Sequence, residues 1–69
     1  MLNIIARKPR GSGWDGEYVI VDRGEGLTCR FVSATVNQQS LKNGEWFWGH
    51  YFASETEAIK HFESRGVPL

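Results

Sequence analysis

The sequence predicts an α+β fold, with three or four antiparallel strands and one C-terminal helix packed on one face of the sheet. Two observations carry this prediction. Residues 17–36 hold two runs rich in β-branched side chains on either side of a turn with two glycines, which is typical of a hairpin. Residues 54–66 carry a helix start and a helix stop. With 69 residues, 41% of them hydrophobic, we expect a single domain, 1–69, without a linker.

The strands are expected to follow one another as a meander. Residues 2–6 form a short apolar run that ends before Pro9 and the glycines after it. Strand character is strong over residues 17–21 and resumes over residues 27–36 after a polar turn. The fourth run, residues 46–52, is aromatic and suits a pleated surface.

Asn43 and Gly44 are expected to form the two-residue turn of the last hairpin, because both residue types accept the positive φ angles of a type I′ turn. This turn would fix the register of the flanking strands, whose side chains alternate between the two faces of the sheet. One face would be smooth and lie under the helix, and it carries Val32, Ala34 and Val36. The other face would carry Thr35, Asn37, Gln39, Leu41, Trp46, Trp48 and His50.

The C-terminal helix is expected over about residues 54–65. Ser54 and Glu57 form a capping box at its start, and Gly66 suits the left-handed position that ends a helix. Its apolar stripe comprises Ala58, Ile59 and Phe62, with Glu57, Lys60, His61 and Ser64 pointing away. A single stripe covers only one face of a sheet, so the opposite face would stay uncovered.

The uncovered face is the main candidate for a functional site. Tryptophan gives a large contact area at small entropic cost, so we expect this face to bind a protein partner. Two alternatives stay open: the N-terminal strand or the loop at residues 8–16 covers the tryptophans, or a one-residue slip or bulge near Gln38 exchanges the faces. The expected contact patch comprises Trp46, Trp48, His50 and Gln39.

The N-terminal segment is a second candidate. Arg7, Lys8 and Arg10 lie in the first ten residues, where there is no acidic residue, and Trp14 follows. We expect these residues to add electrostatic steering toward a partner. Nucleic-acid binding is an alternative, since basic and aromatic side chains beside a glycine-rich backbone hold phosphate and stack bases. A solvated connection with Trp14 folded back is the third reading, and the formal net charge of zero gives no global attraction to nucleic acid.

No catalytic, metal or cofactor site is expected. Cys29, His50 and His61 are the only candidates for a nucleophile and its base, and the sequence does not place them together. Glu57 and His61 with His50 lack a recognisable further metal ligand. The lone Cys29 gives no internal disulfide, and no apolar run reaches membrane-spanning length. We therefore expect a cytoplasmic protein that does not bind membranes.

The order strand, strand, Asn43-Gly44 hairpin and capped terminal helix resembles that of small phage- or mobile-element-encoded proteins, including anti-CRISPR proteins. The resemblance covers the general build of the whole chain and no position-specific motif, so no family residues are transferred. It implies a single-domain α+β inhibitor that occupies a surface on a larger host complex, with a protein partner, no cofactor and no chemistry. A structural homodimer, formed through the uncovered face or an edge strand, is the remaining alternative.

Overall fold

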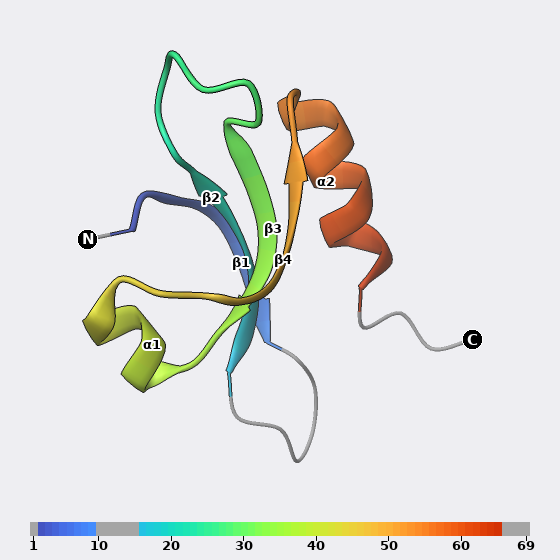
Figure 1. The fold of residues 1–69 in the computed structure, drawn as a ribbon. Helices are drawn as coiled ribbons and strands as arrows, with labels where there is room; N and C mark the ends of the chain where they lie inside the picture. Colours follow the sequence, from blue (N-terminus) through green and yellow to red (C-terminus); the bar gives the residue numbers. More distant parts are fainter. Residues whose placement is uncertain (1, 10–15, 66–69) are drawn as a thin grey trace.

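The computed structural model describes residues 2–9 and 16–65. It confirms the α+β prediction: four strands form one antiparallel sheet in the order β1-β2-β3-β4, and the C-terminal helix packs on this sheet (Figure 1). A second, short helix lies between the third and fourth strands. The elements are β1 (Ile4–Pro9), β2 (Glu17–Asp22), β3 (Phe31–Val36), α1 (Gln38–Asn43), β4 (Phe47–Phe52) and α2 (Glu55–Ser64).

The prediction of an Asn43-Gly44 hairpin is wrong, because the residues before it form α1 rather than a strand. Asn37 caps this helix: its side chain accepts a hydrogen bond from the Ser40 backbone N–H at 2.8 Å, and its own N–H donates to Ser40 Oγ at 2.9 Å. Gly44 has a φ of 71° and ends the helix. A helix end needs positive φ at this glycine alone, whereas a type I′ turn needs it at both residues.

The register between β3 and β4 also differs from the prediction. Phe31 pairs with Phe52, whereas the hairpin would have placed Thr35 there. The register also shifts between Ser33 and Thr35, where β4 carries a bulge that contains Trp48. Side chains change sides across such a bulge. The expected single face with both tryptophans and His50 is therefore absent.

Helix α2 packs on the face of the sheet opposite to the expected one. Ala58 and Phe62 point to the sheet as predicted, but Ile59 is 37% exposed. His61, expected to point away, contacts the sheet through Ser33. Positions 58, 61, 62 and 65 follow the helical period, so the inward stripe is rotated away from Ile59. The residues of this contact are Ile20, Phe31 and Ala58, with Ala6, Phe52 and Phe62 packed against them.

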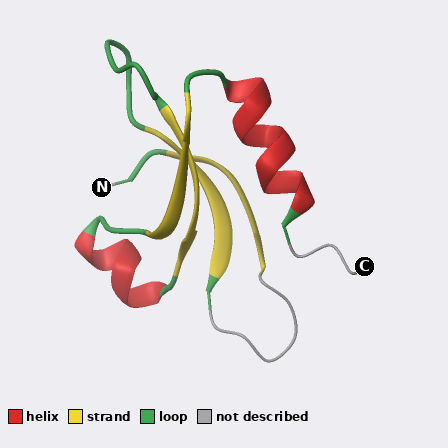
Figure 2. Ribbon diagram, turned by 45° about the vertical axis from the view of Figure 1, so that its right-hand side comes forward, coloured by secondary structure: helices red, strands yellow, loops and turns green. Residues whose placement is uncertain are grey.

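The second face of the sheet holds the larger apolar cluster and is also covered. Its buried residues are Val19, Val21, Val32, Ala34 and Val36, with Leu2, Ile4, Leu41 and Trp46 packed on them. Leu41 belongs to α1, and Figure 2 shows α1 and α2 on opposite sides of the sheet. The prediction of an uncovered face is therefore wrong. The face expected to be free lies under α2, and the valine face, expected to lie under that helix, is covered by Leu41 of α1, Trp46 and the N-terminal residues.

The bounds of α2 confirm the predicted helix. Ser54 is its N-cap and accepts a hydrogen bond from the Glu57 backbone N–H at 3.2 Å, and Arg65 is its C-cap. The expected role of Gly66 lies outside the described residues.

Candidate functional site

Trp48 is the most exposed large apolar side chain of the described residues, with 68% of its surface accessible. Its backbone has a φ of 51°, and no other non-glycine residue in 2–9 and 16–65 has a positive φ. This conformation costs about 1–3 kcal/mol, and such strain is concentrated at functional sites. Phe47 lies beside it, with ring centroids 6.1 Å apart, and is 42% exposed. Both residues lie on β4, which is an edge strand of the sheet.

A second aromatic pair continues the same strand on the face opposite α2. The indole N–H of Trp46 donates to the Tyr51 hydroxyl at 3.3 Å, and the ring centroids are 6.4 Å apart. Gly49 lies directly beneath the indole, since a Cβ atom there would be 2.8 Å from Trp46 Nε1. The guanidinium of Arg23 lies 5.2 Å from the Tyr51 ring centroid. We call Trp46, Phe47, Trp48 and Tyr51 the β4 aromatic surface.

The structure divides the expected contact patch. Trp46, directly before β4, is half-buried on the valine cluster, whereas Trp48 on β4 is 68% exposed, so the alternative in which both tryptophans are covered does not hold for Trp48. Gln39 lies on the exposed side of α1, where its side chain donates to Asn43 at 3.5 Å. His50 lies on the α2 face and stacks against His61.

Sequence reasoning missed three residues of the present site. Phe47 and Tyr51 stand in the aromatic run 46–52, so the signal was present, but the predicted register assigned neither to the contact face. Arg23 follows β2 directly in the chain and carries no sequence signal that links it to β4. Only the three-dimensional arrangement brings its guanidinium onto Tyr51.

Arg7 and Lys8, the two N-terminal basic residues that the structure describes, have partners within the chain. Arg7 forms an ion pair with Glu17, and this contact holds the pKa of the Glu17 carboxyl below its usual range and raises the pKa of Arg7. Lys8 donates to the Glu63 carbonyl at 3.4 Å and lies 4.8 Å from the Phe62 ring centroid, so it caps the end of α2. The expected roles of Arg10 and Trp14 lie outside the described residues.

A polar cluster anchors α2 on the sheet. His61 Nδ1 lies 2.8 Å from Ser33 Oγ, and the ring centroids of His61 and His50 are 4.3 Å apart. Arg65 donates to Thr35 Oγ1 at 3.2 Å. Burial lowers the pKa of His61, and the charges of His50 and Arg65 lower it further. Because Ser33 is fully buried, its hydroxyl serves this anchoring contact.

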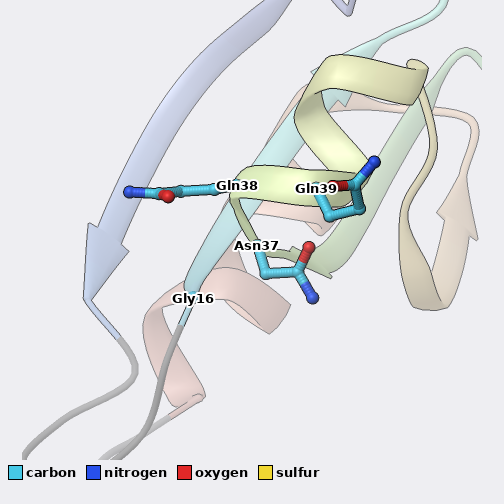
Figure 3. A pocket seen from close by; sticks show the side chains of 4 residues that line it. All are labelled: Gly16, Asn37, Gln38 and Gln39. Carbon is cyan, nitrogen blue, oxygen red and sulfur yellow. The ribbon is translucent and has the colours of Figure 1, made fainter.

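The described residues offer little else in the way of a metal, membrane or ligand site. Within 2–9 and 16–65, no group of three or more His, Cys, Asp or Glu residues could hold a metal ion. No helix in the same part of the chain has the length and apolar character needed to span a membrane. A hollow of about 360 Å³ lies at the start of α1, beside Gly16. Of its three amide side chains, Gln38 and Gln39 point in different directions, and Asn37 Oδ1 accepts the hydrogen bond that caps α1, so they do not converge on a ligand position (Figure 3).

Comparison with known proteins gives no match among protein-family models, curated proteins or solved structures. The β4 aromatic surface is therefore the feature of this chain that points to a function.

Proposed function

We propose that this protein is a small non-catalytic binding module that acts stoichiometrically on a larger complex through the β4 aromatic surface. One observation carries the proposal: an indole that is 68% exposed is held by a left-handed backbone on an edge strand. Tryptophan, tyrosine and arginine are the residues most enriched at binding hot spots. All three types meet here, in Trp48, Trp46, Tyr51 and Arg23.

The size of the protein fits this role. Its accessible surface is 4814 Å². A standard protein interface buries about 800 Å² on each partner, which is about a sixth of that area. The β4 edge of the sheet, together with the neighbouring loop that carries Arg23, is therefore large enough to form an interface of this size. A protein that blocks a larger assembly, as inhibitors of the anti-CRISPR type do, needs only to bind it and needs no catalytic group on its binding surface. A cytoplasmic setting is part of the proposal and agrees with the single free Cys29.

The test begins with affinity capture from the native host and continues with the measured affinity of the captured complex. We expect Trp48→Ala to weaken binding about 30-fold, because a hot-spot tryptophan contributes about 2 kcal/mol. Ile59→Ala is the matched control, since Ile59 is 37% exposed but lies on α2. Equal affinities for Trp48→Ala and the unchanged protein would refute the proposal.

A structural homodimer is the second candidate. It is favoured by the position of β4 at the sheet edge and by the lack of Asp, Glu, Lys or Arg in Phe47–Phe52. Sedimentation over a concentration series separates the two functions. A dimer that dissociates in Trp48→Ala would assign the surface to self-association.

A further inference from the structure

An open hollow of about 420 Å³ adjoins Trp46 on the face of the sheet opposite α2. The N-terminal residues, the end of β2 and the loop that follows it form its border. This volume lies within the usual range of about 300–1,000 Å³ for ligand sites. Its apolar wall is Leu2, Val21 and Trp46, and its polar rim is Asn3, Asp22, Arg23 and Gly24.

The apolar wall is preformed. Val21 is 1% exposed and belongs to the valine cluster on which Leu2 and Trp46 pack. The indole of Trp46 is fixed from two sides, by close contact with Gly49 and by the hydrogen bond to Tyr51. A ligand therefore meets a wall that needs no ordering, which lowers the entropic cost of binding.

The charges of the rim favour an anion. Asp22 accepts hydrogen bonds from Arg30 at 2.7 and 2.9 Å and from the Gly24 N–H at 2.9 Å. These bonds hold the pKa of Asp22 below its usual value, and Arg30 balances its charge. Arg23 donates to the Cys29 carbonyl at 3.0 Å but forms no ion pair with any residue in 2–9 or 16–65. Among residues 2–9 and 16–65, Arg23 is thus the exposed cation of this rim, and its guanidinium is not used in an ion pair.

We propose that this hollow receives an apolar side chain of the protein partner, with an adjacent carboxylate of that partner paired to Arg23. The inference rests on the proposed protein-binding function, and it adds the chemistry that the partner must present. A partner segment bound along β4 can reach the hollow. Trp46 belongs both to the β4 aromatic surface and to the lining of the hollow, and Arg23 of the rim contacts the ring of Tyr51 on β4. The apolar wall selects a leucine-sized side chain, and the guanidinium selects the carboxylate.

The test uses N-acetyl-leucine as the probe and follows the ¹⁵N-labelled protein by NMR. We expect the Trp46 indole N–H and the amides of Val21 and Arg23 to shift, with a dissociation constant on the order of 1 mM. N-acetyl-leucinamide, which lacks the carboxylate, should bind about threefold more weakly, as expected for an exposed ion pair. N-acetyl-alanine should cause no shift at the same concentrations, because its methyl group leaves most of the apolar wall uncovered.

Arg23→Gln provides the matched variant. It should reduce the affinity for N-acetyl-leucine to that for the amide, while binding of the amide itself stays unchanged and reports that the hollow is intact. Shifts away from the hollow, equal shifts with N-acetyl-alanine, or no shifts at all would overturn the inference. Trp48→Ala separates this inference from the proposed function. If the variant loses partner binding but the unchanged protein does not bind the probe, only the inference about the hollow is refuted. If the unchanged protein binds the probe but the variant keeps its full partner affinity, only the proposed partner surface is refuted.

Discussion

Replacing Gly49 by alanine is expected to destabilise the protein, because the indole of Trp46 occupies the space of the new methyl group. The added Cβ would lie 2.8 Å from Trp46 Nε1 and 3.0 Å from Cγ1 of Val32, which is fully buried. Overpacking of this kind costs about 1–3 kcal/mol. The lower entropy of the unfolded chain with alanine returns about 0.4–1 kcal/mol. A net loss of about 1–2 kcal/mol lowers the Tm by about 5–15 °C for a domain of this size.

Urea unfolding followed by tryptophan fluorescence measures this loss. The background variant Trp46→Ala is the control, because it removes two of the three close contacts of the new methyl group. In that background the cost of Gly49→Ala should fall to less than half, as a double-mutant cycle would show. A Gly49→Ala protein as stable as the unchanged chain, or an equal cost in both backgrounds, would refute the contact between the indole and position 49.

Two further predictions concern the anchoring of the helices. His61 has a lowered pKa and is favoured neutral in the folded state, so stability should be full above its ordinary value of 6.5 and fall as the pH drops below it. The urea midpoint should therefore decrease as the pH is lowered below 6.5. A midpoint that stays constant would contradict the contact of His61 with Ser33. Asn37→Ala removes the N-cap of α1 and should cost about 1 kcal/mol in urea unfolding; an unchanged stability would show that the cap contributes nothing.

The elements that the sequence predicted well depend on local signals. The helix from Ser54 to Arg65 needs only its cap and its own periodicity, and both are contained in the segment. The strands β2 and β3 are marked by β-branched residues on either side of a glycine turn. These signals do not change with the surroundings, so the α+β class followed from them.

The region between β3 and β4 was mispredicted because two local signals compete there. Asn43-Gly44 favours a hairpin, and the Asn37 to Ser40 spacing favours a helix cap. Packing decides between them: Ser40 is buried in α1, and Leu41 contacts the valine cluster. That contact is made with strands distant in sequence, so residues 37–44 alone do not reveal it.

The candidate site was predicted only in part for the same reason. The exposure of Trp48 was expected, but it depends on a bulge in β4 for which Gly49 was the available sequence signal, and the predicted register did not use it. The predicted face assumed strict alternation from Trp46 to His50, and one inserted residue places these side chains on opposite faces.

The irregularity at Trp48 and Gly49 also bears on how this molecule avoids uncontrolled assembly. A straight, apolar border strand would offer its main chain to any extended polypeptide and invite stacking into fibres. In β4 the bulge at Trp48 interrupts the row of main-chain donors and acceptors, so another strand cannot form a continuous ladder of hydrogen bonds along the whole of β4. Under the proposed binding function, the partner would therefore be recognised by the aromatic side chains of β4, which differ between proteins, rather than by its backbone, which does not.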